Sequence, residues 1–79
     1  MITPERRDIL RLLEPLSELS TDMRFGQLIC NLVTLAGGRT AEAIWDIEDD
    51  QLLAAIHKFT DDLTRFHADR AAEAAAPTV

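Results

Sequence analysis

The hydrophobic pattern is most regular between residues 22 and 36, where it predicts a central helix. Apolar side chains recur there at the i, i+3, i+4, i+7 spacing that gathers them on one face of a helix. Polar side chains follow a neighbouring row at the i, i+3, i+7 spacing. We therefore expect a core-facing stripe of Phe25, Leu28, Ile29, Leu32 and Ala36 beside a polar row of Arg24, Gln27 and Asn31.

The chain before this segment predicts a first helix over residues 4–19. Thr3 suits the N-cap and Pro4 the first helical position. Pro15 interrupts the pattern, because an internal proline removes a backbone hydrogen bond and clashes one turn back, at about 3 kcal/mol. Since the apolar spacing continues beyond it, we expect the helix to kink at Pro15 rather than to end. Its core side would comprise Ile9, Leu12, Leu13, Leu16 and Leu19.

The longest predicted helix covers residues 47–70. Asp46 is placed to cap it, and three acids would occupy the first turn, where the partial positive charge of the helix end favours them. Successive apolar residues of this helix are alternately four and three positions apart, as in helices that pack along each other. We call this row the apolar seam. Beyond it, residues 71–79 form an alanine-rich tail, in which residues 71–76 can continue as a solvent-exposed helix and which we expect to fray at Pro77. The acids are Glu48, Asp49 and Asp50, and the seam consists of Leu52, Ile56, Phe59, Leu63 and Phe66.

Short turn signals separate these helices. Cap residues at 20–22 mark the turn into the central helix, and Gly37-Gly38 ends it, since glycine takes the left-handed conformation without a side-chain penalty. Gly26 costs about 1 kcal/mol inside a helix relative to alanine. It is either tolerated near the helix start or allows close approach of another backbone or of the Trp45 ring. As the only tryptophan, Trp45 is expected to close the core between the helices.

These elements predict an all-α fold, a small bundle of three main helices in a single domain over residues 1–70, with four structural anchors. At 79 residues the chain is near the size where one core gives only marginal stability, so dimerisation is a reasonable expectation. One cysteine cannot form an internal disulfide, which favours a reducing, cytoplasmic setting. No apolar run approaches the roughly 18–20 residues that cross a bilayer. The anchors are Gly26, Trp45, Asp46 and Asp50.

Charge is distributed unevenly and bears on the partner. Residues 1–39 are balanced, whereas residues 40–79 hold three basic and nine acidic side chains and so carry the whole net charge of −6. Nucleic-acid binding normally needs clustered Lys and Arg, which the acidic half opposes. The pattern fits a basic protein partner, or serves solubility alone.

No group of residues predicts catalysis, a cofactor or a metal site. The acids at 46–50 resemble a calcium loop only in composition, because Gln51 and His57 stand where that loop has its glycine and its last acid. Helix capping explains them better. Cys30 lies on a helix with no predicted base beside it and is interpreted as a small core residue. We therefore expect no enzymatic activity.

The polar row has two interpretations. As internal bracing, the row would bond the connector, the 46–50 segment or the backbone near Pro15. Pairing of Arg24 with a carboxylate of the 46–50 segment would then join the two anchor regions. As a recognition face, Arg24 would be the charged contact, while Gln27 and Asn31 would supply amide groups to a partner.

Two blocks in this sequence carry a resemblance. The pattern Arg24-x-Gly26-Gln27-Leu28-x-x-Asn31-Leu32, followed by Trp45-Asp46-x-Glu48-Asp49-Asp50-x-Leu52-Leu53, resembles that of short uncharacterised bacterial helical proteins. It covers about 30 residues, from Arg24 to Leu53. The resemblance implies that both blocks belong to one structural unit, and it carries no activity to this chain.

Three function classes remain in view, of which the last, an enzyme or metal protein, is the one that metal analysis of the purified chain would support or dismiss. The first is a small acidic protein-interaction module, that is, an adaptor, an inhibitor of immunity or antitoxin type, or a regulatory subunit. The alternative is a helix-turn-helix-like DNA-binding regulator. The helix after Gly38 would then read the DNA, but it begins with acids that repel phosphate.

Overall fold

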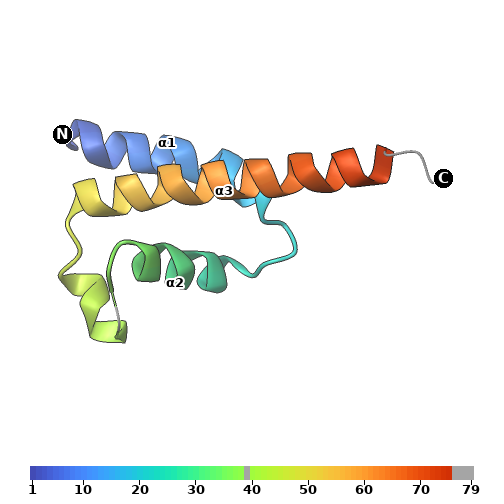
Figure 1. The fold of residues 1–79 in the computed structure, drawn as a ribbon. Coiled ribbons are helices and arrows are strands. Elements are labelled where there is room, and N and C mark those ends of the chain that lie inside the picture. The colour runs from blue at the N-terminus through green and yellow to red at the C-terminus, as the bar shows by residue number, and fades with distance from the viewer. Residues whose placement is uncertain (39, 76–79) are drawn as a thin grey trace.

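The computed structural model of the protein describes residues 1–38 and 40–75. Its elements are α1 (Pro4–Leu19), α2 (Phe25–Leu35), the short 3₁₀-helix η1 (Ala41–Trp45) and α3 (Asp49–Ala75). Helices α1 and α3 lie side by side and run in the same direction, while α2 runs the opposite way along their shared side (Figure 1). The predicted all-α bundle of three main helices is confirmed.

Helix α1 begins and continues as its residues predict. The Arg6 N–H donates to Thr3 Oγ1 at 3.2 Å, which makes Thr3 the N-cap. The helix runs through Pro15 to Leu19. Because proline has no N–H, the backbone carbonyl one turn earlier lacks its usual hydrogen-bond donor. Pro15 is exposed, so water can reach that carbonyl instead. At the far end Ser20 is buried, and its hydroxyl donates to the Leu16 carbonyl at 2.8 Å.

Helix α2 is shorter than predicted at its start and ends as predicted. It begins at Phe25 rather than at residue 22, because residues 20–23 form the turn and Arg24 occupies the N-cap position. Gly37 has a φ of 106°, and the Gly38 N–H donates to the Val33 carbonyl at 2.9 Å. This is the glycine-based C-cap expected at the end of a helix.

Helix α3 starts two residues later than predicted and runs further. Glu48 is its N-cap, because the Glu48 carbonyl accepts from the Leu52 N–H at 3.0 Å. Asp46 instead ends η1, where its N–H donates to the Ala43 carbonyl, so the prediction that Asp46 caps α3 is wrong. Asp50 lies in the first turn as predicted. The helix continues to Ala75, five residues into the predicted tail, and Pro77 lies outside the described residues.

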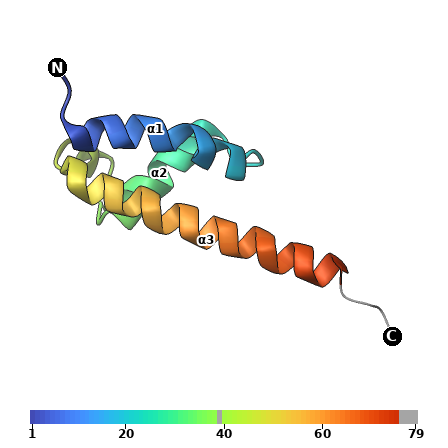
Figure 2. The same ribbon diagram turned by 90° about the horizontal axis from the view of Figure 1, so that it is seen from above.

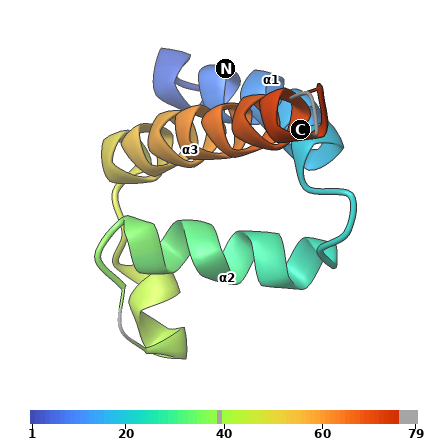
Figure 3. The same ribbon diagram turned by 45° about the vertical axis from the view of Figure 1, so that its right-hand side comes forward.

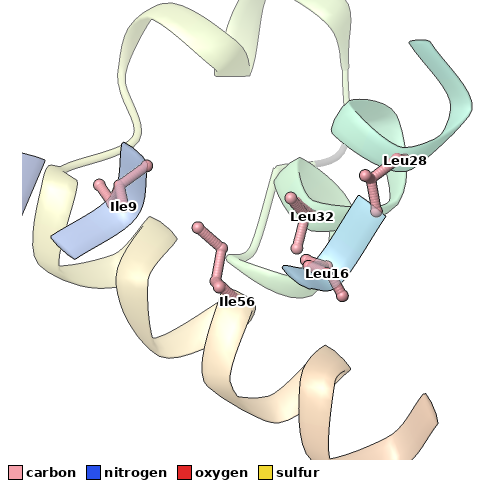
Figure 4. Close-up of a cluster of buried hydrophobic side chains, with 5 residues drawn as sticks. All are labelled: Ile9, Leu16, Leu28, Leu32 and Ile56. Atoms are coloured by element: carbon pink, nitrogen blue, oxygen red, sulfur yellow. The ribbon is translucent and has the colours of Figure 1, made fainter. Parts of the chain in front are cut away.

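The core consists of aliphatic side chains contributed by all three helices. Leu16, Leu32 and Ile56 meet at its centre (Figure 4). Partly buried residues of the predicted stripes pack around them, among them Leu52, Phe59 and Leu63. Helix α3 continues well past the end of α1, so its last turns project from the bundle (Figure 2). Ile9 and Leu28 complete the buried cluster.

Three aromatic residues that the sequence predicts to pack in the core lie outside it, and those predictions are wrong. Trp45 is 83% exposed, Phe25 is 58% exposed, and Phe66, the last residue of the predicted seam, is 52% exposed. Aliphatic side chains already fill the space between the helices, and η1 lies beyond α2 on the side away from α1, so Trp45 does not reach that space (Figure 3). Phe25 is the first residue of α2, almost one turn before the first buried residue of that helix, Leu28.

Candidate interaction surface

Helix α2 has one face in the core and one face open. Leu28 and Leu32 are buried against the bundle. Cys30 follows Leu28 by two residues, about 200° around the helix, and therefore points away from the core. We call the exposed residues on that side the outer face of α2; they are Gly26, Gln27, Cys30, Asn31 and Thr34.

The first hollow on this surface lies at the N-terminal half of α2. It has a volume of about 340 Å³ and includes two residues of the predicted polar row. The Asn31 side-chain amide donates to Met23 Sδ at 3.4 Å. Gln27 Oε1 accepts from the Arg24 N–H at 2.9 Å, which satisfies one of the free amides at the helix start. The hollow is lined by Asp22, Met23, Gln27, Cys30 and Asn31.

The second hollow, of about 330 Å³, lies between α2 and the segment that leads into η1. Its walls are mainly apolar, with Ile29 and Val33 from α2 facing Ile44 from η1. A Cβ placed on Gly26 would meet nothing within 4 Å. The expectation that Gly26 permits close approach of a backbone or of Trp45 is therefore wrong, and the missing side chain leaves space in the hollow instead.

Cys30 lines both hollows. Its side chain is exposed, so its interpretation as a core residue is wrong. The prediction fails because Cys30 directly follows the core-facing residue Ile29, while the helical rotation of about 100° per residue takes it out of the core. An accessible thiol group thus lies at the centre of the outer face.

Beside the second hollow, η1 presents large apolar side chains to solvent. Ile44 is half exposed and Trp45 is almost fully exposed. The neighbouring acids Glu42 and Asp46 are also exposed, so the aromatic ring is flanked by negative charge. A tryptophan ring with an acidic rim suits contact with a neutral or basic protein surface.

The polar row does not brace the fold through a carboxylate. Arg24, Gln27 and Asn31 are all exposed. Among the described residues, the ion pair that joins the first and last helices is Arg6 with Asp49, at 3.8 Å, and Arg24 takes part in none. Gln27 instead accepts from the Arg24 N–H, and Asn31 donates to Met23 Sδ, so these two side chains have local structural roles. The recognition role of the row stays a prediction.

One sequence signal could have identified this surface. Residues 25–38 contain no charged side chain. A helix that is apolar on every side is normally buried, whereas a helix at the surface has polar or charged residues on its open face. The lack of charge between residues 25 and 38 is therefore the sequence feature that distinguishes the outer side of α2, where the polar residues are uncharged.

Comparison of the chain with protein-family models, with curated proteins and with solved structures found no match. None of the described helices is long and apolar enough to cross a membrane.

Proposed function

We propose that this chain is a small protein-interaction module, an adaptor, inhibitor or regulatory subunit, acting in a reducing compartment such as the cytoplasm. The observation that carries the proposal is Trp45, a residue that is 83% exposed and directly follows Ile44, which lines the apolar hollow of η1 and α2. Tryptophan is among the residue types that most often contribute a large share of the binding energy of protein interfaces.

The charges of the surface support a neutral or basic partner. The whole chain carries a net charge of −6, and Glu42 and Asp46 flank the tryptophan. Arg24, at the N-cap position of α2, is exposed and positively charged. The same acidity argues against the helix-turn-helix alternative, because α3 opens with Asp49 and Asp50, which would face the phosphates.

The test is a cross-linked capture from the source cells with tagged wild-type protein and the Trp45→Ala variant. A central interface tryptophan typically contributes at least about 2 kcal/mol, so the variant should lose the specific partner. Leu10→Ala is the matched control, because Leu10 is also a large exposed apolar residue but lies on α1. Circular dichroism confirms the fold of each variant.

A specific partner that is captured by the wild-type chain and by Leu10→Ala, but not by Trp45→Ala, would support the interaction module. Recovery of the same proteins by all three chains would contradict it. An Arg24→Ala/Asn31→Ala variant in the same experiment shows whether the polar row belongs to the contact.

A further inference from the structure

The side of α1 that faces away from the core carries its charges in a self-complementary order. Residues at the spacing i, i+4, i+7 and i+11 form one row along a helix. On α1 such a row runs along the exposed side, opposite the buried residues Ile9 and Leu16. It consists of two bases followed by two acids, all of them exposed. We call it the charged row of α1; its residues are Arg7, Arg11, Glu14 and Glu18.

This order of charges is unfavourable within a single chain. Arg7 and Arg11 are one turn apart, and so are Glu14 and Glu18, so that like charges are neighbours along the row. Arg7 lies in the first turn of α1 and Glu18 in the last, and each has the sign that the helix dipole disfavours at its end. The reverse order would serve solubility equally well without the second of these costs.

The described part of the chain leaves much of the charged row without opposite charges. Arg11 donates to Asp8 at 2.9 Å, in an exposed ion pair within α1. Arg7, Glu14 and Glu18 take part in no ion pair among the described residues. Helices α2 and α3 contribute their buried side chains to the core on the other side of α1 (Figure 2). Charges that satisfy the row would therefore come from outside the chain.

A second α1 laid antiparallel along the first supplies these charges. The row is centred between residues 12 and 13, so a two-fold axis at that point places Glu18 of the second copy opposite Arg7. The same rotation places Glu14 of the second copy opposite Arg11, and the symmetry repeats both pairs. Spacings of four, three and four residues keep two helices in register at a shallow crossing angle, here over the roughly 16 Å from Arg7 to Glu18.

We propose that two copies of this chain associate through the charged row of α1, antiparallel about a two-fold axis between residues 12 and 13. A second copy is the partner that the row fits, because the order of its charges is its own complement when reversed. Leu10 lies about 70° to one side of the row and is not one of the contacts. Trp45 and η1 lie beyond α2, away from α1, so the inference does not rest on the proposed function (Figure 3).

The association is expected to be weak. Exposed ion pairs contribute little individually, because solvent screens them. Repulsion between two chains with a net charge of −6 each opposes the contact further. We therefore expect a dissociation constant on the order of 0.1 mM, so that the chain is monomeric at about 1 µM and largely dimeric at about 1 mM.

Charge reversal tests the pairing. Sedimentation equilibrium at concentrations up to about 1 mM measures the dimer, with a reductant that keeps Cys30 a thiol. Arg7→Glu/Arg11→Glu makes the row wholly acidic. Glu14→Arg/Glu18→Arg makes it wholly basic. Either change should weaken the dimer at least about tenfold, because every pair then joins like charges. All four substitutions together restore a self-complementary order and should return the affinity to within about threefold of wild type.

Net charge is the control. Lys58→Glu/Arg65→Glu changes the net charge as much as the wholly acidic variant does, but on exposed residues of α3, and should weaken the dimer far less. The wholly basic variant carries less net charge than the wild type, so general repulsion would strengthen its association where the charged row predicts a loss. Circular dichroism confirms each fold, and should one double variant not fold, the other carries the same test.

A wild-type chain that remains monomeric at about 1 mM would overturn the proposal. So would double variants that associate as the wild type does, or a wholly basic variant that associates more strongly. A folded chain with all four substitutions that fails to dimerise would also overturn it, since the order of the row would then not be the cause. Trp45→Ala should leave the dimer unchanged, so failure of the dimer leaves the interaction module standing.

Discussion

Single residues at the ends of the helices set the path of the chain. Ser20 is only 4% exposed, and its hydroxyl reaches the last turn of α1 instead of remaining without a partner. Gly38 is buried where the chain leaves α2. A Cβ on Gly38 would lie 2.6 Å from Val33 Cγ1 and 3.0 Å from the Val33 carbonyl oxygen. The glycine is therefore needed for close packing at this point.

Gly38→Ala should destabilise the protein by about 1–3 kcal/mol, because the added methyl group has to displace Val33 or the backbone. Urea unfolding followed by circular dichroism measures the change. Gly26→Ala is the control and should leave stability unchanged or raise it by up to about 1 kcal/mol, since its Cβ meets no neighbour and alanine favours the helix. Equal effects of the two substitutions would contradict this account of Gly38.

At the scale of the elements, α3 provides the surface on which the other two helices pack. Ile56 is fully buried between α1 and α2. Further along, the His67 Nε2–H donates to the Leu19 carbonyl at 2.8 Å and joins α3 to the end of α1. The exposed ion pair of Arg6 with Asp49 adds little, because solvent screens such pairs to about 0–1 kcal/mol.

Ile56→Ala should cost about 2–5 kcal/mol, because it removes a fully buried side chain and leaves a cavity. In so small a protein this loss is a large part of the total stability, and we expect the variant to be partly unfolded at about 25 °C. Phe66→Ala is the comparison on the same helix: Phe66 is half exposed and should cost far less. Thermal unfolding by circular dichroism separates the two.

The sequence predicted the positions of the helices better than it predicted which of their residues face solvent. Helical spacing identified the buried residues of α1 and α3, and the cap residues placed the helix ends within a few positions. The errors concern Phe25, Gly26, Cys30, Trp45, Asp46 and Phe66. Apolar residues near a helix end have the spacing of core residues whether or not a neighbouring helix covers them. The exposure of Trp45 follows from the position of η1 beyond α2, which the sequence does not predict.

At the scale of the whole molecule, the three helices bury a small core and leave α2 half covered. The long α3 and the outlying η1 give the chain extents of 54 × 28 × 18 Å. This shape follows from helices that cover one another on one side only. The uncovered side of α2 and the exposed ring of Trp45 are the features on which we base the proposal that the molecule is one part of a larger assembly.

The reactivity of Cys30 tests that claim most directly, because it is the only thiol of the chain and lies at the centre of the outer face. The measurement is its rate of alkylation by a maleimide, read by mass spectrometry, in the dilute purified chain and in fresh extract of the source cells depleted of small thiols, at the same pH. The reference is the thiol of Leu10→Cys in a Cys30→Ser chain, which lies exposed on α1 and experiences the same loss of reagent to other thiols. We predict that transfer to the extract slows Cys30 several-fold more than the reference thiol, because another molecule covers the outer face of α2. Equal slowing of the two thiols would contradict the account.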